Sequence, residues 1–193
     1  MKNLLKILPV LFLLFGMSNL IPFTVYGEDL TVSELLEKAQ KVDAGAQYTL
    51  GEKYKYGEGV VEDDKESLKW YSQAAYSYRI LAEQGDADAQ YILGYMYQDG
   101  KGVIQDYKKS AKWYTRAAEQ GHTQAQFNLG WMYEQGEGVL QDYIRAYAWY
   151  SIAASQQHDV AKYNRDIILP KMTRTQIEEG QRFAKKLYGK IYK

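Results

Sequence analysis

The two histidines are the first side chains to consider as ligands or catalysts. His122 and His158 stand 36 residues apart, and the chain has no others. Imidazole binds zinc and related metals together with cysteine or carboxylate ligands, but no cysteine is present to complete such a site. Other sequence features recur at the same spacing. Repetition therefore explains the histidine pair better than a metal site does.

Three glycine loops and the aspartates after them could also hold a ligand. The Gly-x-Gly-Val loops comprise Gly57, Gly59 and Val60, then Gly100, Gly102 and Val103, then Gly136, Gly138 and Val139, and Asp63, Asp106 and Asp142 follow them. A phosphate-binding loop would add a third glycine or a Lys-Ser/Thr pair. A calcium loop would gather several oxygen ligands within one loop. Ser-x-x-Lys, which marks penicillin-recognising serine enzymes, is missing as well. We therefore predict no catalytic residue, no metal and no cofactor.

These motifs recur because the chain repeats itself. AQYTLGEKYKYGEGV begins at Ala46, AQYILGYMYQDGKGV at Ala89 and AQFNLGWMYEQGEGV at Ala125. Blocks 86–121 and 122–157 match at 17 of 36 positions. Repeats of this length are typical of stacked supersecondary units.

Each unit reads as two helices joined by the glycine loop. In the second unit Ala89, Leu93 and Tyr97 lie at i, i+4 and i+8 on one helical face, with Gly94 beside Leu93. A glycine in mid-helix costs about 1 kcal/mol relative to alanine, so we expect close approach of a neighbouring helix there. The first loop glycine should end the helix in a left-handed conformation, and the valine should turn back onto the core.

The second helix of each unit carries a small residue, a tryptophan and an alanine at i, i+3 and i+7. In the second unit these are Ser110, Trp113 and Ala117. Large and small residues on one face let adjacent helices interdigitate. The aspartate before each of these helices is placed to cap its free N–H groups.

A unit of about 36 residues that runs A-x-x-x-L-G-x-x-Y-x-x-G-x-G-V-x-x-D and then W-Y-x-x-A-A resembles the Sel-one-like repeat (SLR), which is related to the tetratricopeptide repeat. This resemblance implies an all-α fold, a right-handed α/α solenoid of antiparallel helix pairs with three SLR units and capping helices. The predicted segments are a signal peptide (1–27), an N-terminal capping helix (28–42), three repeats (43–85, 86–121 and 122–157), and a degenerate fourth first helix with a closing helix (158–193).

The ends carry helix-start signals. Thr31 and Glu34 fit a capping box before an amphipathic helix that would stand in for a missing second helix. A fourth first helix is expected from Asp159 to Ile168. The closing helix should start at Thr173, with a second capping box to Gln176, and run to about Tyr188. Such end caps are needed because an uncapped repeat exposes its apolar face.

The first repeat carries seven extra residues, 76–82, within its second helix. Seven residues make close to two helical turns, so the helix should lengthen by roughly 10 Å and keep its packing face in phase. We expect the longer helix to protrude. Tyr76, Tyr78 and Arg79, with Ile80, are then secondary candidates for a partner contact.

The inner, concave face of the solenoid is the main candidate surface. In the related family this groove is lined by the residues three before, one after and four after the glycine of each first helix. Carried over to this chain, these partner-binding candidates are Tyr48, Glu52, Lys55, Tyr91, Tyr95, Gln98, Phe127, Trp131 and Glu134. Tyr91 and Phe127 have an alternative role in packing against the next repeat. Tyr95 and Trp131 are expected to be exposed, as aromatic residues are common at interface hot spots.

Residues 1–27 combine Lys2 and Lys6 with the apolar run 7–15, which indicates a secretory signal peptide and an exported protein, periplasmic or secreted. An uncleaved anchor is the alternative, although Gly16 and Pro22 interrupt the run. The remaining 166 residues carry 22 basic and 24 acidic side chains. That balance indicates neither nucleic acid nor an anionic membrane surface as the partner, and we expect no stable membrane insertion after cleavage.

We therefore predict a non-enzymatic scaffold or adaptor that binds a protein or peptide through its concave face. A module that binds a cell-wall glycan or peptide is the alternative. A β-lactam-interacting hydrolase is a third possibility, because some cysteine-rich secreted SLR proteins are linked to β-lactam binding. This chain lacks their cysteines.

Overall fold

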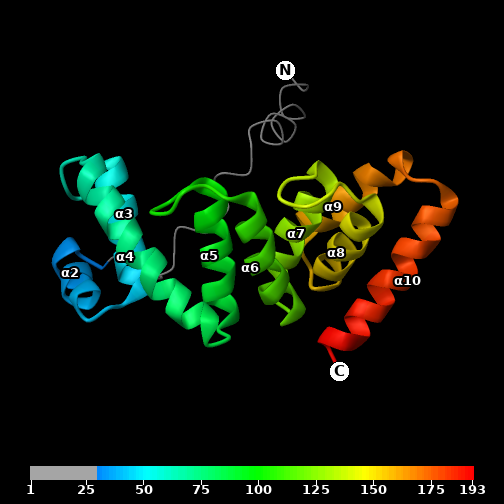
Figure 1. Ribbon diagram of the computed structural model, residues 1–193, viewed down its shortest axis with the longest axis horizontal. Helices are drawn as coiled ribbons and strands as arrows, with labels where there is room; N and C mark the ends of the chain where they lie inside the picture. The colour runs from blue at the N-terminus through cyan, green and yellow to red at the C-terminus, as the bar shows by residue number, and fades with distance from the viewer. Residues whose placement is uncertain (1–29) are drawn as a thin grey trace, which may run out of the picture.

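In the computed structural model, residues 30–193 are described, and they contain nine α-helices and no strand (Figure 1). The helices are α2 (Val32–Gln40), α3 (Ala44–Tyr56), α4 (Asp64–Glu83), α5 (Ala87–Asp99), α6 (Tyr107–Glu119), α7 (Thr123–Gln135), α8 (Tyr143–Ser155), α9 (Asp159–Ile168) and α10 (Arg174–Ile191), with a 3₁₀ turn at Leu169–Lys171. The predicted signal peptide lies outside the described residues.

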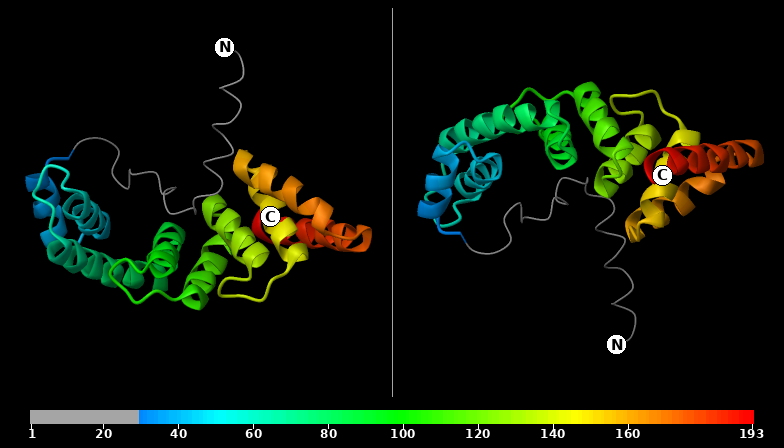
Figure 2. Two further views of the ribbon diagram at one scale, coloured as in Figure 1. Left: turned by 90° about the horizontal axis from the view of Figure 1, so that it is seen from above. Right: turned by 90° about the horizontal axis from the view of Figure 1, so that it is seen from below.

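Successive helices pair and stack along one axis. α3 packs on α4, α5 on α6 and α7 on α8, and each pair packs on the next. The stack curves, with α3, α5, α7 and α9 on its inner side and α4, α6 and α8 on its outer side (Figure 2). The prediction of an all-α solenoid of antiparallel helix pairs is confirmed.

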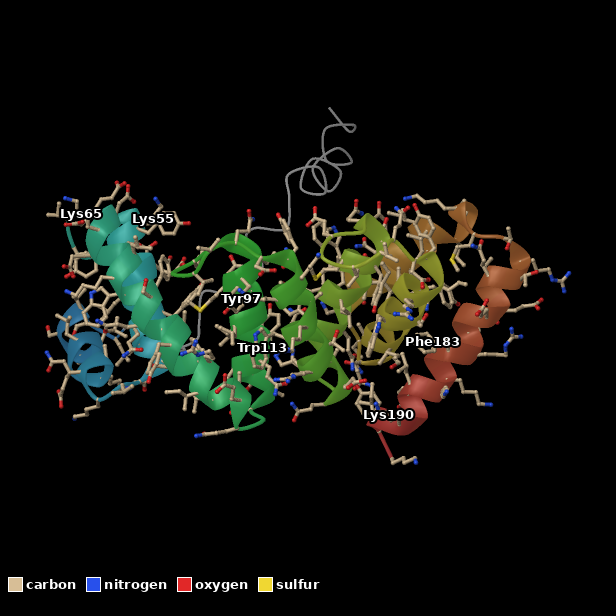
Figure 3. The ribbon with its side chains drawn as sticks, viewed as in Figure 1. Lys55, Lys65, Tyr97, Trp113, Phe183 and Lys190 are labelled. Carbon is tan, nitrogen blue, oxygen red and sulfur yellow. The ribbon has the colours of Figure 1, made fainter. Side chains whose placement is uncertain are left out.

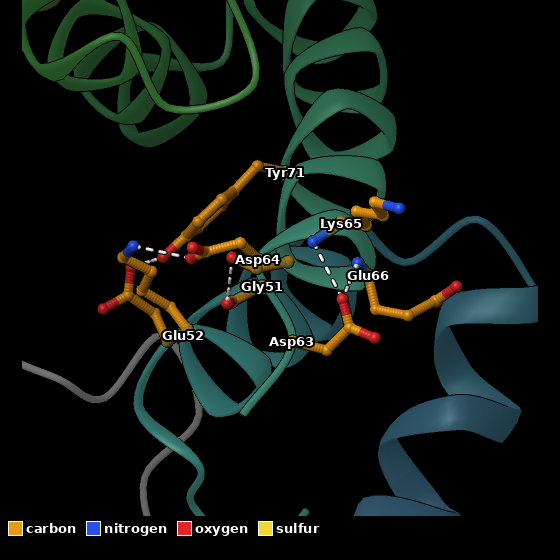
Figure 4. Close-up of polar contacts among 9 residues, drawn as sticks. Gly51, Glu52, Asp63, Asp64, Lys65, Glu66 and Tyr71 are labelled. Carbon is orange, nitrogen blue, oxygen red and sulfur yellow. Dashed lines mark hydrogen bonds and ion pairs between the residues drawn. The ribbon is translucent and has the colours of Figure 1, made fainter. Parts of the chain in front are cut away.

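The predicted helix ends are confirmed at the level of hydrogen bonds. The Asp63 carboxylate accepts bonds from the backbone N–H of Lys65 (2.8 Å) and Glu66 (3.1 Å) at the start of α4 (Figure 4). Asp106 and Asp142 cap α6 and α8 in the same way. Gly57, Gly100 and Gly136 end α3, α5 and α7 with φ of 69°, 71° and 76°, a left-handed conformation that glycine adopts without a steric penalty.

The mid-helix glycines are explained by a tyrosine ring from the paired helix. A Cβ built on Gly94 would lie 2.7 Å from Cδ1 of Tyr114, and one on Gly130 would lie 2.8 Å from Cδ1 of Tyr150. Both tyrosines are fully buried. Gly51 meets the ring of Tyr71 at 2.6 Å in the same manner. The expected close approach is therefore confirmed, and a tyrosine ring is what makes it.

A buried glutamine ties each first helix to the helix before it. The side-chain amides of Gln47, Gln90 and Gln126 donate to the carbonyls of Ala39, Ala82 and Ala118, at 3.2, 3.0 and 3.2 Å. Each bond spans the junction between two stacked pairs. Since Ala39 belongs to α2, that helix takes the place of a preceding second helix, as predicted.

The seven extra residues lengthen α4 to 20 residues, against 13 in α6 and α8. In each later repeat, the second glycine of the Gly-x-Gly-Val loop touches the second helix of the preceding repeat, so this contact shows where along that helix the repeat docks. A Cβ on Gly138 would strike the carbonyl of Tyr107, the first residue of α6, whereas one on Gly102 would strike the backbone of Tyr71, the eighth residue of α4. The second repeat is therefore displaced by seven residues, or roughly 10 Å, along α4.

The prediction that this longer helix protrudes is wrong. α5 packs on α4, and Tyr78 and Ala82 are buried. The extra turns are used to dock the second repeat, so Tyr78 contributes to the core instead of to a surface contact. Tyr76, Arg79 and Ile80 on the other face of α4 are exposed, and the Arg79 guanidinium lies 5.4 Å from the Tyr76 ring.

Helix α2 precedes the three repeats, and α9 and α10 follow them. The capping boxes at Thr31 and Thr173 are both formed, and α9 has the predicted bounds. α10 runs three residues beyond the predicted end at Tyr188 and packs along α8. Phe183 on α10 packs partly buried against the core, and Lys190 near its end pairs with Glu119 of α6 at 3.1 Å (Figure 3). Buried Trp113 belongs to the same core (Figure 3).

Replacing Gly94 with alanine tests the tyrosine–glycine contact. The added methyl group must displace the Tyr114 ring, which is fully buried. We expect a loss of about 1–3 kcal/mol of unfolding free energy, as for overpacked cores, measured by urea unfolding. Gly189→Ala in α10 is the matched control, since nothing lies within 4 Å of its Cβ position. That variant should gain up to about 1 kcal/mol from helix propensity. Equal gains in both variants would show that the ring does not require the glycine.

Candidate functional site

The nine predicted groove residues fall into three groups of exposure. Tyr48, Tyr91, Tyr95, Phe127 and Glu134 are buried, Glu52, Gln98 and Trp131 are partly exposed, and Lys55 is exposed. The expectation that Tyr95 is exposed is wrong, because only 5% of its surface is accessible. Trp131 is half-buried and packs against both neighbouring core clusters. Tyr91 and Phe127 fit their alternative role in packing between repeats.

The buried ring of Tyr95 belongs to a cluster of side chains around a lysine. Lys101, from the loop after α5, lies 5.4 Å from the ring centres of Tyr48 and Tyr71 and 5.2 Å from that of Tyr95. Its ammonium group also pairs with the Glu52 carboxylate at 2.6 Å. The lysine and glutamate side chains are only 19% and 14% exposed. We call Tyr48, Tyr71, Tyr95 and Glu52 the Lys101 cage. It binds a cation by ring quadrupoles and one opposite charge.

The groove positions nearest the outer helices are held by tyrosine hydroxyls. Tyr71 donates to the Glu52 carboxylate (Figure 4). Tyr114 donates to the Gln98 amide oxygen at 2.8 Å, and Tyr150 donates to the Glu134 carboxylate at 2.9 Å. Lys171 also approaches Glu134, at 3.3 Å. These groove side chains therefore join the two layers of helices, whereas Lys55 forms an exposed pair with Asp64 at 2.7 Å.

The two histidines are helix caps. Nδ1 of His122 accepts from the N–H of Ala125 at 3.2 Å, and Nδ1 of His158 accepts from that of Ala161 at 3.1 Å. The two rings stack on Tyr91 and Phe127 of the preceding repeat, with centroids 4.4 and 4.6 Å apart. An Nδ1 acceptor requires a neutral ring, and burial lowers the pKa of both histidines.

A pocket of about 260 Å³ opens between α5, α7 and the start of α9. It is lined by Tyr91, Tyr95 and Gln98, by Gln124, Phe127 and Asn128, and by His158, Asp159 and Val160. We call this the inner pocket. Four of its nine residues are predicted groove residues. Burial raises the pKa of Tyr91 to about 12, so its hydroxyl is un-ionised at neutral pH.

The prediction missed residues of the fourth repeat that continue this surface. Tyr163 and Ile167 stand 36 residues after Phe127 and Trp131, and the repeat period alone would have found them. They are 48% and 43% exposed, because within residues 30–193 no further repeat stacks on α9. Val160 lies one turn before Tyr163 and lines the inner pocket. We call Val160, Tyr163 and Ile167 the α9 stripe.

The secondary candidates on α4 lie on a separate surface. Tyr76 lines a second, more open hollow with Val42, Gln47, Ser72, Gln73 and Ser77. Tyr78 is buried and is removed from the candidate surface.

Residues 30–193 contain two histidines and no cysteine. Within that range no group of three His, Cys, Asp or Glu side chains could hold a metal ion. None of the helices described there combines the length and apolarity needed to cross a membrane.

Comparisons with known proteins agree on one family. A family model described as Sel1 repeat matches residues 44–77, 87–122 and 123–158. Among solved structures, a protective antigen of uropathogenic Escherichia coli with an SLR fold is 27% identical, with a TM-score of 0.61, over 83% of this chain and 41% of that one. A Sel1 repeat protein from Oxalobacter formigenes is 37% identical, with a TM-score of 0.52, over 70% of this chain and 96% of that one. No curated protein sequence matches significantly. Because the match covers 41% of the Escherichia coli antigen, this chain spans less than half of that protein's length.

The Lys101 cage makes a prediction for stability. Lys101→Met leaves the largely buried Glu52 carboxylate without its cation. Breaking such a pair from one side costs up to about 3–5 kcal/mol, and we expect about 2 kcal/mol here because some exposure remains. Urea unfolding of Lys101→Met, Glu52→Gln and the double variant gives the coupling energy. A coupling below about 0.5 kcal/mol would contradict a specific pair.

The histidine caps predict a pH dependence. Because folding lowers the pKa of both rings below the ordinary value of about 6.5, the stabilisation they provide is complete above that pH. It is lost as the pH falls from the unfolded through the lower folded pKa, since the unfolded chain then binds more protons.

The control replaces both caps with aspartate, the residue that caps α3 and α5. Urea unfolding at about pH 7.5 and about pH 5.5 should show that the parent loses about 1 kcal/mol more than His122→Asp/His158→Asp, the size of one cap. Equal losses in the two proteins would mean that the histidines do not titrate with unfolding.

Proposed function

The chain belongs to the Sel1 repeat family, and from this premise we propose that it is a non-enzymatic scaffold that binds a protein or peptide on the inner face of its solenoid. The resemblance to SLR proteins is confirmed by the three matched repeats and by the solved structures. Proteins of this family generally serve as protein–protein interaction scaffolds. The inner face and the export of this chain are the finer parts of the proposal.

The observation that carries the proposal is an open, partly apolar surface at the C-terminal half of the inner face. The inner pocket lies between α5, α7 and α9, and the α9 stripe continues from it. Half-buried Trp131 stands on α7, the neighbouring inner helix. Aromatic and aliphatic side chains that are already ordered and partly exposed are typical of interface hot spots.

The groove is also held rigid before any partner binds. Tyrosine hydroxyls fix Gln98 and Glu134, and the histidine caps stack on Tyr91 and Phe127. Side chains that are ordered in the free protein lose little entropy on binding, so even a short groove can bind usefully. A short groove fits a peptide or the edge of one domain better than a large partner surface.

Export remains part of the proposal. The apolar N-terminal run with its lysines supports it. The chain has no cysteine, so its stability in an oxidising compartment rests on packing instead of on disulfides. The matched Escherichia coli protein is a protective antigen.

The test is affinity capture from envelope and secreted fractions with the parent and a Trp131→Ser/Tyr163→Ser variant, which we call the groove variant. Both aromatic residues are partly exposed, so the variant should fold, which circular dichroism checks. We expect a partner that the parent captures and the variant loses, with an affinity reduced by about 2 kcal/mol or more, as at hot spots.

The matched control is Ile104→Ser/Leu140→Ser, which removes two aliphatic side chains from the loops after α5 and α7. These residues are 91% and 90% exposed and lie outside the inner pocket. The control should keep the partner. If only the Ile104→Ser/Leu140→Ser control lost the partner, the interface would lie on the loops after α5 and α7, and the inner-face proposal would be overturned. Specific binding to purified sacculi, abolished by the groove variant, would favour a glycan partner instead.

A further inference from the structure

The inner pocket has the composition of a cation-binding site. Its walls include the rings of Tyr91, Tyr95 and Phe127. Gln98, Gln124 and Asn128 supply amide groups, and Asp159 supplies a carboxylate. None of the nine lining residues is a lysine or an arginine, and the histidine is held neutral by its capping role. Aromatic faces and a carboxylate without a basic side chain favour a positively charged guest.

The same protein already binds a cation one repeat earlier. In the Lys101 cage, Tyr48 occupies the position in α3 that Tyr91 occupies in α5, and Tyr95 contributes to both places. The loop residue equivalent to Lys101 in the third repeat is Glu137. The next repeat therefore supplies no lysine of its own. The Lys101 cage is thus an internal example of the contact that an external cation could make in the inner pocket.

Asp159 supplies the opposite charge at the mouth of the inner pocket. It is exposed, it lines the inner pocket, and its charge acts on the neighbouring His158 ring. Its place in the first turn of α9 suits the positive end of the helix dipole, which is its structural role. The backbone N–H of Ala161 at the start of α9 donates to Nδ1 of His158, so it does not bond to Asp159. The Asp159 carboxylate remains available for a ligand.

The size of the inner pocket indicates one side chain as the guest. Its volume of about 260 Å³ is below the roughly 300–1,000 Å³ of pockets that hold drug-sized ligands. Guanidinium is planar, stacks on aromatic rings and offers several N–H donors to amide and carboxylate oxygens, whereas ammonium is a compact, strongly hydrated point charge. The ring walls and the Asp159 carboxylate of the inner pocket match guanidinium better. The amide oxygens of Gln98 and Gln124 already bond to Tyr114 and His158, so they contribute less to this match.

We infer that the inner pocket binds an arginine side chain of an extended partner segment, whose neighbouring apolar residue lies on the α9 stripe. This inference rests on the proposed function, because it names the chemistry of the partner at the same inner face. Asp159 pairs with the guanidinium, which contacts only those parts of the Tyr91, Tyr95 and Phe127 rings that line the pocket. The His122 ring, the Lys101 ammonium and the His158 ring already occupy other sides of these three rings.

The experiment uses N-acetyl-arginine-N′-methylamide as the probe and its citrulline counterpart as the neutral control of nearly equal shape. The side-chain amide signals of Gln124 and Asn128 in the ¹⁵N-labelled protein report binding. We expect saturable shifts with the arginine probe in the millimolar range, and at least about fivefold weaker binding of the citrulline probe, because it lacks the cation–π and ionic contacts.

Asp159→Asn should weaken the arginine probe by about two- to fivefold, the effect of one exposed ion pair. Glu179→Gln is the matched control, because it removes the same charge from an exposed position on α10 away from the inner pocket. It should leave binding unchanged. Equal binding of the two probes, or equal weakening by the two substitutions, would overturn the inference.

The two proposals fail separately. A partner captured through Trp131 and Tyr163, together with no shift from the arginine probe, would keep the scaffold function and overturn the arginine pocket. Probe binding that depends on Asp159, together with capture that the groove variant does not change, would support the arginine pocket. It would overturn Trp131 as a partner contact and the placement of the partner's apolar residue on Tyr163 of the α9 stripe.

Discussion

The contact on which the rest of the solenoid depends is a tyrosine ring lying on a glycine of the paired helix. Tyr114 on Gly94 and Tyr150 on Gly130 set how closely the two helices of a unit approach. The same tyrosines send their hydroxyls past the glycine to Gln98 and Glu134 on the inner face. One residue therefore fixes helix separation and orders a groove side chain. Packing between helices and the order of the inner face are therefore coupled in each unit.

Much of the fold could be predicted because its signals are local. The carboxylates of Asp63 and Asp106 cap helices that begin within three residues of them, and Gly100 needs its left-handed φ whatever lies beyond. The spacing of Ala89, Leu93 and Tyr97 fixes one helical face. Such features depend on backbone geometry over a few residues. They are readable from the sequence before any packing is known.

The candidate site was less predictable, because exposure depends on contacts between repeats. Tyr95 follows the glycine of α5 just as Trp131 follows that of α7, yet Lys101 covers its ring while Trp131 stays half-exposed. In the third repeat, Glu137 stands in place of Lys101. One of the rings that Lys101 contacts, Tyr48, lies on the preceding repeat, so the position of the lysine over Tyr95 could not be predicted from the sequence. Tyr163 and Ile167 were overlooked for another reason. Their helix lacks the glycine by which the groove positions were counted, although the 36-residue period still reaches them.

The open surface lies at the C-terminal half of the inner face, beyond a place that the chain fills with its own lysine. Between the first two repeats, the space beside Tyr48 and Tyr71 is occupied by Lys101 and neutralised by Glu52. Later units follow a second helix of ordinary length and have Glu137 in place of that lysine. The fourth repeat then ends after α9 without a stacking neighbour for Tyr163. The Lys101 cage, the inner pocket and the α9 stripe therefore follow one another along the inner face. Under the proposed function, the inner pocket and the α9 stripe can receive a partner without displacing another part of the chain.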